Sequence, residues 1–331
     1  MAAGVRFADR VIAVSPSYAK QIEVSCDGLE HLLHNVIGIS NAVGRDFLAR
    51  AKQRFEDSGF VKIYYPGFLK HVSEDMKLQK KIETRYPELL RGAYCCESVE
   101  NDIRRKNLVR MRNKMLLQVK HGLTVDPDKV LFTMIHRMVE QKGFQLLLEA
   151  SEGIFKNLGY QGVIGGPLAP CNPRGEEYAH GLMLLKDYYP GSVSVNIGFQ
   201  DVSIPLLSSD VFLMPSMYEP CGIAQLEAFA CGCLVVARAT GGLRDTVYPL
   251  QVKRRIIEGN GFIFQDFKPQ FFYDAMERCM TFFRQADEAL LYKARCNAER
   301  SICYWDKSAQ RYIDEIYSIK EIIRKEVNVT V

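Results

Sequence analysis

Between residues 126 and 300, short apolar runs alternate with segments whose apolar residues recur at helical spacing. Short runs rich in Val, Ile, Leu and Phe are typical of strands buried on both faces of a sheet. We expect such strands at 130–135, 162–166, 193–197, 210–214, 233–236 and 261–264. Strands that alternate with helices form a parallel sheet, and right-handed crossovers cover both of its faces. The pattern predicts an α/β fold with a doubly wound, Rossmann-like parallel sheet.

The intervening segments give the expected helices of this sheet. We expect helices at 144–158, 176–188, 202–207 and 223–230, another starting at 242, and further helices up to about residue 326. Each connection is long enough for the crossover that parallel strands require.

The N-terminal third is organised differently. An apolar run at 10–14 precedes Ser15, which can cap a helix with Pro16 in its first turn. Residues 45–125 are charged and mostly helical in pattern, including a helix at 101–120. We interpret them as a helical insertion whose charges form a solvated face.

Composition excludes several classes of protein. The formal net charge of +4, from 43 Lys and Arg against 39 Asp and Glu, is too small for a dedicated nucleic-acid-binding protein. No apolar run approaches the length that spans a bilayer, so we expect no membrane partner. The ten cysteines are scattered and the six histidines show no ligand spacing, which indicates a reduced intracellular protein without a metal site.

Ligands of doubly wound sheets bind at the carboxyl ends of the strands, so the loops there are the places to look for chemistry. The loop after the strand at 130–135 carries Arg137 and Lys142, two cations that suit a diphosphate. The strand at 162–166 ends in Gly165 and Gly166, which allow a ligand close to the backbone. Taken singly, each loop has an ordinary structural explanation.

Two further loops add acidic side chains and amide-rich turns. Glu219 stands between a strand and a helix, and Glu227 lies eight residues later in that helix. The first-turn amides at Gly222, Ile223 and Ala224 can hold phosphate. The turn of Thr240, Gly241 and Gly242 opens another helix at the same edge. Two cations, two acids and two such turns together favour a site for a phosphorylated sugar.

These motifs resemble those of the glycogen and starch synthases, retaining glucosyltransferases with the two-domain GT-B fold. The resemblance covers about 1–40 and 126–320. Its specific parts are Tyr218-Glu-Pro-Cys-Gly222 and Thr240-Gly-Gly-Leu-Arg-Asp-Thr-Val247. The Arg137-x-x-x-x-Lys142-Gly segment and the stretch around Tyr304-Trp305 support it.

The resemblance implies four parts. Residues 1–44 would be a remnant of the N-terminal GT-B domain with the hinge, and 45–125 the helical insertion. Residues 126–300 would form the nucleotide-sugar-binding domain, the C-terminal half of the GT-B fold. Residues 301–331 would form a helix that packs back toward the N-terminal domain.

The resemblance also implies roles for individual residues. Arg137 and Lys142 would hold the donor diphosphate, Glu219 would orient the donor glucose, and these three would be the catalytic residues. The donor cleft would be lined by Gly165, Gly166, Phe199, Tyr218, Cys221, Gly222, Ile223, Ala224, Thr240, Gly241 and Gly242, with Phe199 near the nucleobase. Glu227 would contact the ribose, as in related GT-B enzymes.

The implied reaction transfers glucose from ADP-glucose or UDP-glucose to the 4-OH of an α-1,4-glucan, with retention and without metal or other cofactor. The partners would be the nucleotide-glucose donor, the glucan acceptor and an N-terminal acceptor domain that the chain mostly lacks. Glu227 favours an alternative, a sucrose-synthase-like or mannosyl-type GT-B enzyme. The absence of the acceptor half of the site favours a further alternative, a non-catalytic protein that binds glucan or nucleotide sugar. The expected location is cytoplasmic, with the plastid as the alternative.

Overall fold

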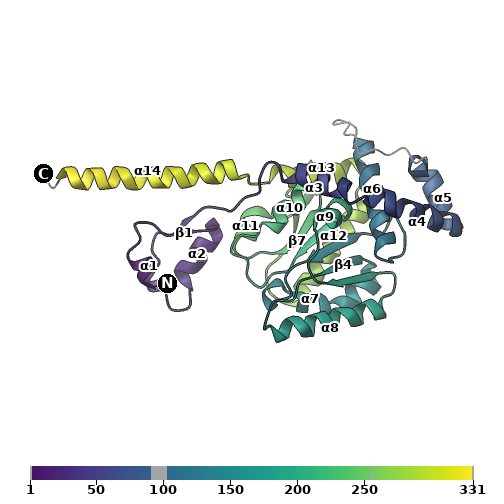
Figure 1. Cartoon of the computed structure of the whole chain (residues 1–331), viewed down its shortest axis with the longest axis horizontal. Coiled ribbons are helices and arrows are strands. Elements are labelled where there is room, and N and C mark those ends of the chain that lie inside the picture. The colour runs from purple at the N-terminus through teal and green to yellow at the C-terminus, as the bar shows by residue number, and fades with distance from the viewer. Residues whose placement is uncertain (1, 91–102, 255, 330–331) are drawn as a thin grey trace.

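The computed structural model describes residues 2–90, 103–254 and 256–329. At its centre lies a six-stranded sheet in the order β10-β7-β6-β3-β4-β5, and every neighbouring pair is parallel (Figure 1). The strands are β3 (Leu131–Ile135), β4 (Gln161–Gly166), β5 (Val193–Ile197), β6 (Val211–Met214), β7 (Leu234–Arg238) and β10 (Gly261–Phe264). The predicted doubly wound parallel sheet is confirmed.

The strand order decides where a ligand can bind. The chain builds β3, β4 and β5 toward one edge and then returns to place β6 on the other side of β3. Loops after β3 and β6 therefore leave the sheet in opposite directions and open a crevice between them. Both loops carry residues that the sequence singled out.

Helices cover both faces of the sheet. On one face α7, α8 and α12 pack together, and on the other α6, α9, α10 and α13 do so. Their bounds are α6 (Ile103–Lys120), α7 (Phe144–Glu149), α8 (Pro173–Tyr188), α9 (Ser203–Ser208), α10 (Ala224–Ala230), α12 (Pro269–Gln285) and α13 (Glu288–Arg300). Because all five residues of β3 are buried, the strand reads as an unbroken apolar run in the sequence.

The prediction differs from the structure in two places. The single helix expected at 144–158 is wrong, since α7 gives way to the π-helical segment η4 (Glu152–Leu158). Within η4, a Cβ at Gly153 would lie 2.4 Å from the ring of Tyr273, so the glycine admits that ring. The sequence also missed the antiparallel pair β8 (Gln251–Lys253) and β9 (Ile256–Glu258), whose largely exposed residues leave no apolar pattern.

The segment between residues 45 and 125 is helical, as predicted. It contains α3 (Phe47–Asp57), α4 (Phe60–Glu74), α5 (Met76–Arg85), η2 (Pro87–Leu90) and α6, while residues 101 and 102 of the expected last helix lie outside the described residues. These helices share a buried cluster with Leu131 and Val163 of the sheet. The expectation that the charges form a solvated face is wrong for Arg112 and Lys114, both buried on α6.

The N-terminal segment forms a small unit beside the sheet domain (Figure 1). It comprises α1 (Ala2–Arg6), β1 (Ile12–Ala13), α2 (Pro16–Val24), η1 (Glu30–Leu32) and β2 (Ile37–Gly38), with β1 parallel to β2. The predicted cap is confirmed, because the Ser15 hydroxyl accepts from the amide of Tyr18. The long helix α14 (Trp305–Val329) extends from the sheet domain past this unit. None of the described helices is long and apolar enough to cross a bilayer.

Candidate functional site

Lys142 and Glu219 meet at the crevice between β3 and β6. The Lys142 Nζ atom donates to Glu219 Oε2 over 2.6 Å, and the two side chains are only 14% and 9% exposed. The Ser216 hydroxyl donates to the same oxygen over 3.2 Å. Two residues separated by 77 positions thus form one nearly buried ion pair where the strand order predicts a ligand.

Backbone contacts lock the two loops together. Met217 donates its amide to the carbonyl of Gln141 over 2.8 Å, and the Gln141 side chain donates to the carbonyl of Tyr218 over 3.0 Å. Gly143 has a φ of 74°, and a Cβ there would lie 2.1 Å from the Pro215 carbonyl oxygen. The loop after β3 therefore rests directly on the loop after β6, which fixes Lys142 relative to Glu219.

Arg137 lies on the same loop as Lys142, two residues beyond the end of β3. Its side chain is exposed and forms no hydrogen bond or ion pair with any described residue. The preceding residue, His136, is buried and its Nε2–H donates to the Leu213 carbonyl over 2.7 Å. Burial, and then the charge of Lys142, lower the pKa of His136 to about 4, so its ring is neutral near pH 7.

The glycines that end β4 are required by backbone packing. Gly166 has a φ of 134°, and a Cβ there would lie 1.8 Å from the His136 carbonyl oxygen. At Gly165 the added atom would lie 2.0 Å from the carbonyl oxygen of Asn196 on β5. Close strand packing thus gives both glycines a structural reason, independent of any ligand. Phe199 follows β5 and is 91% exposed.

The turn before α11 (Gly242–Thr246) packs against the backbone of Glu219. Gly242 donates its amide to the Glu219 carbonyl over 3.0 Å, and Gly241 has a φ of 43° that brings its backbone against the same carbonyl. Thr240 is buried beside them. This turn therefore supports the loop that carries Glu219.

The short turn ahead of α10 offers free donors. The amides of Gly222, Ile223 and Ala224 have no acceptor among the described residues. Ile223 is partly exposed, and so is Tyr218 on the same loop. Cys221, in contrast, is buried, and burial raises the pKa of its thiol to about 11.

The N-terminal segment touches the back of this loop. The Ser15 hydroxyl donates to the Pro220 carbonyl over 2.6 Å. Ser17 donates both its amide, over 2.9 Å, and its hydroxyl, over 2.6 Å, to the carboxylate of Asp245 on α11. The Cys221 thiol faces the Asn41 carbonyl at 3.8 Å. The start of α2 thereby packs beside the Glu219 loop.

Glu227 is half-buried on α10 and is not in contact with Glu219 through any described hydrogen bond. Burial raises its pKa, and the positive charge of Arg54 on α3 opposes that rise. Arg54 also lies 3.9 Å from Asp201, two residues after Phe199. Glu227 therefore faces the α3 side of α10, apart from the Lys142–Glu219 pair.

Sequence reasoning missed several residues that hold the site. Ser216 and Gln141 lie within the loops already singled out, and their polar side chains beside Glu219 and Lys142 were the available signal. Asp245 lies in the recognised motif after Gly242, but its partner, Ser17, comes from the far end of the chain. No local pattern reports such a contact.

Three comparisons with known proteins show what the chain is similar to. The family model described as glycosyl transferases group 1 matches residues 118–282. The chain is 39% identical over 207 residues to a glycogen synthase of Kosmotoga olearia, covering 62% of this chain and 41% of that protein. It is 31% identical over 316 residues to a glycogen synthase of Trichodesmium erythraeum, covering 95% of this chain and 58% of that protein. The chain thus spans less than two thirds of the length of each of these relatives.

Solved structures with the GT-B fold match nearly the whole chain. The catalytic domain of starch synthase IV from Arabidopsis thaliana, bound to ADP and acarbose, matches with a TM-score of 0.66 and 23% identity, covering 96% of this chain and 57% of that one. Anabaena HepE in complex with UDP and glucose matches with a TM-score of 0.58 and 15% identity, covering 95% of this chain and 65% of that one. At such identities the likeness establishes the fold, and the predicted α/β fold with a parallel sheet, shared with GT-B enzymes, is confirmed.

Proposed function

Because the chain belongs to the group 1 glycosyl transferases, with glycogen synthases among its relatives, we propose that it is the donor-binding half of a retaining α-glucan synthase. In this proposal it transfers glucose from a nucleotide-glucose to the 4-OH of an α-1,4-glucan. In this proposal an acceptor-binding half completes the cleft. The cytoplasmic location expected from the sequence belongs to the same proposal.

The observation that carries the proposal is the Lys142–Glu219 pair at the strand crevice. A cation and a carboxylate held 2.6 Å apart give adjacent sites for a diphosphate and for sugar hydroxyls. Arg137, exposed and unpaired among the described residues, supplies a second cation from the same loop. The free amides from Gly222 to Ala224 would add donors to phosphate oxygens.

The proposed chemistry is electrostatic. As the bond between glucose C1 and the diphosphate breaks, negative charge grows on the leaving phosphate, and Arg137 with Lys142 stabilises it. Glu219 accepts hydrogen bonds from the glucose hydroxyls and holds the ring in place. The leaving phosphate takes the proton of the incoming 4-OH on the same face, which retains the configuration. Loss of one phosphate-holding cation is expected to lower the rate by on the order of 10²–10³.

Glu227 favours a second candidate function, that of a GT-B transferase of the sucrose-synthase or mannosyl type. There a carboxylate eight residues after Glu219 binds the ribose. Glu227 is half-buried on α10 near Arg54. This position supports the second transferase only if the ribose of the donor reaches the α3 side of α10. The substitution E227Q separates the two cases, because only a ribose contact makes it weaken the binding of both ADP and UDP.

Binding and turnover test the proposal separately. We expect calorimetry to detect binding of ADP-glucose or UDP-glucose to the chain, and R137A to weaken it about tenfold or more by removing a charged hydrogen bond. R174A is the matched control, because Arg174 is also exposed but its only ion pair with a described residue, Glu140, is long at 3.8 Å. Binding without transfer to glycogen fits a half-site. A folded chain that binds neither nucleotide sugar refutes the proposal.

A further inference from the structure

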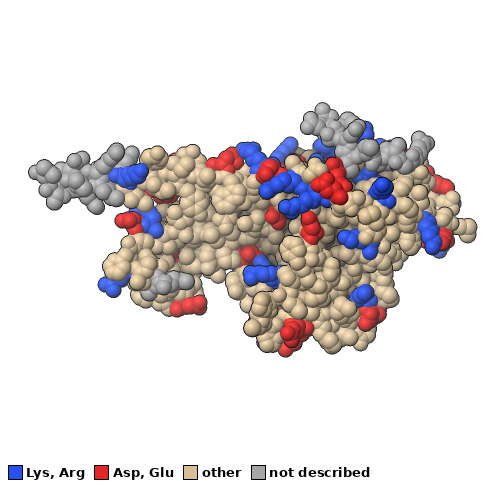
Figure 2. All heavy atoms as spheres, viewed as in Figure 1, with Lys and Arg blue, Asp and Glu red and all other residues tan. Residues whose placement is uncertain are grey.

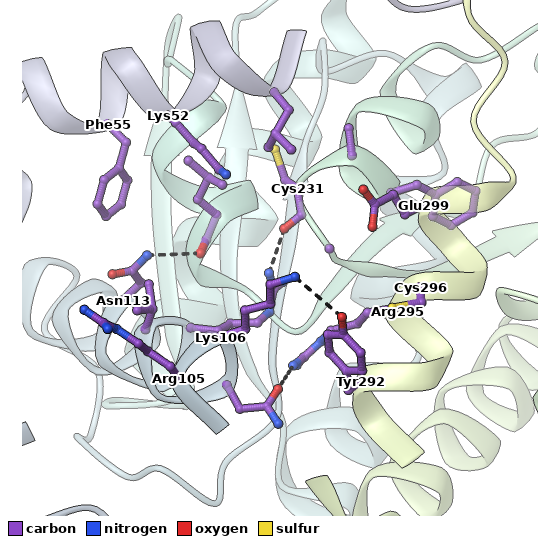
Figure 3. Close-up of a pocket in the computed structure, with 18 of the residues that line it drawn as sticks. Lys52, Phe55, Arg105, Lys106, Asn113, Cys231, Tyr292, Arg295, Cys296 and Glu299 are labelled. Atoms are coloured by element: carbon purple, nitrogen blue, oxygen red, sulfur yellow. Dashed lines mark hydrogen bonds between the residues drawn. The ribbon is translucent and has the colours of Figure 1, made fainter. Parts of the chain in front are cut away.

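A second hollow of about 320 Å³ lies among α3, α6, α10 and α13, away from the crevice (Figure 3). Its wall is partly apolar, with Leu48, Phe55, Leu207 and Phe229. The charged residues that line it are the basic Lys52, Arg105, Lys106, Arg110 and Arg295 and the acidic Glu56 and Glu299. A volume of this size accommodates a small organic molecule. The excess of basic residues favours an anion.

The hollow lies at the opposite edge of the sheet from the donor site. Arg110 donates to the carbonyls of Ser209 and Cys231, and these residues precede β6 and β7. Lys142 and Glu219 instead follow the carboxyl ends of β3 and β6. The hollow shares no lining residue with the predicted donor cleft. It is therefore a separate site.

Positive charge is buried beneath the hollow with too little negative charge to balance it. Arg295 and Lys114 share one carboxylate, Asp210, at 3.4 Å and 3.0 Å. Arg110 adds a third cation and pairs with no carboxylate among the described residues. Burial, and then the charge of Arg110, lower the pKa of Arg295 to about 10. An anion in the hollow would relieve this repulsion.

Two of the guanidinium groups at the hollow each have one N–H without a partner. The Nε atoms of Arg110 and Arg295 are buried and have no hydrogen-bond partner in the described part of the chain. A buried N–H without a partner is costly, which adds to the uncompensated positive charge of these two guanidinium groups. Nearer the surface, Lys52 and Lys106 form no ion pair with a described residue, and the Lys106 amine donates to the Tyr292 hydroxyl over 3.5 Å.

Charge at the surface agrees with the interior. Figure 2 shows Lys and Arg side chains gathered over the part of this face where α3 and α13 lie in Figure 1, with an acidic group beside them. In Figure 3, Lys52, Lys106 and Arg295 surround the hollow, whereas Arg105 extends away to one side. Lys52 and Lys106 would therefore contact a ligand first, and Arg110 and Arg295 would hold its charge.

We propose that this hollow binds a small organic phosphate, whose dianionic head lies among Arg110, Arg295, Lys52 and Lys106 and whose body contacts Phe55 and Leu48. The site does not depend on the proposed transferase activity, because none of its residues lies at the crevice. Phenyl phosphate is a suitable probe, since it joins a phosphate dianion to an apolar ring.

Isothermal titration calorimetry of the whole chain tests this site. We expect phenyl phosphate to bind the unaltered chain, and K52E/K106E to weaken binding about tenfold or more, because each lysine contributes a charge-assisted hydrogen bond. Both lysines are exposed, so the fold should survive, which circular dichroism checks. K80E is the matched control, because Lys80 is an exposed lysine on α5, outside the hollow. This variant should bind phenyl phosphate as tightly as the unaltered chain does. R137A, at the donor edge, should also leave the affinity unchanged.

Four outcomes would overturn the proposal. They are absence of binding at millimolar phenyl phosphate, equal weakening by K80E, loss of binding in R137A with K52E/K106E unaffected, and equally tight binding of inorganic phosphate. The third places the anion at the donor crevice, and the fourth removes the role of the apolar wall. Because R137A is read in both experiments, failure of the donor proposal and failure of this one give different patterns.

Discussion

Replacing Lys142 by Met would leave the charge of Glu219 buried without its partner. The pair is 2.6 Å apart and its side chains are 14% and 9% exposed, so neither charge is well solvated. Removing one member of a buried pair typically costs about 3–5 kcal/mol. The Ser216 hydroxyl, 3.2 Å from Glu219 Oε2, still stabilises the carboxylate, so we expect a loss of ~2–3 kcal/mol in the free energy of unfolding.

Urea denaturation of K142M, E219Q and K142M/E219Q measures this loss as a double-mutant cycle. The double variant contains no unpaired charge, so its stability should lie within ~1 kcal/mol of the unaltered chain. E219Q alone should cost less than K142M, because the long Lys142 side chain can turn toward the open crevice. The control is K156M, since Lys156 and Glu152 form a 2.9 Å pair that is 68% and 69% exposed, and its loss should cost under ~0.5 kcal/mol.

The reasoning fails if K142M is no more destabilising than K156M, or if the double variant is as unstable as K142M. The first result would mean that water reaches Glu219 freely. The second would mean that Lys142 stabilises the loop by packing and not by its charge.

Three further predictions concern neighbouring positions. Between pH 7 and pH 4.5 the free energy of unfolding should fall by about 2–3 kcal/mol on account of His136, whose pKa is about 4 when folded and 6.5 when unfolded. The unfolded chain takes up this proton first as the pH falls, and denaturation of H136Q should show a shallower pH dependence. G166A should lower the free energy of unfolding by about 2 kcal/mol or more, because the added Cβ would lie 1.8 Å from the His136 carbonyl oxygen. The control is G198A, because Gly198 has a φ of 135°, close to the 134° of Gly166, but open space around it. G198A should cost only the backbone strain of about 1 kcal/mol. F199A should leave the melting temperature unchanged, since the ring is 91% exposed, and should weaken nucleotide-sugar binding by about 1–2 kcal/mol if the ring stacks on the base, as calorimetry can show.

Much of the sheet domain follows from local sequence. The strand predicted at 193–197 has the same bounds in the structure, where it is an edge strand whose apolar Val193, Val195 and Ile197 alternate with polar residues. Ser15 and Pro16 marked the start of α2 for the same local reason. The exposed β8–β9 pair escaped prediction because nothing in its residues requires burial.

Charged residues on α6 could not be assigned from the sequence. Lys114 is buried because Asp210, 96 positions later, lies 3.0 Å from it at the start of β6. A helix segment rich in Arg and Lys reads as solvent-facing unless its distant partner is known. The basic hollow stayed hidden for the same reason, since α3, α6, α10 and α13 each contribute part of it.

The sequence by itself determined which residues follow the carboxyl ends of the strands, because apolar residues and their periodicity mark each strand locally. It did not determine that Lys142 and Glu219 touch. That contact requires β6 to lie beside β3, and strand order is set by how the helices pack across the whole sheet. The balance of charge is likewise a tertiary property. Burial removes much of the solvation of Lys142, Glu219 and Arg295, so each charge is stabilised by partners far away in the chain.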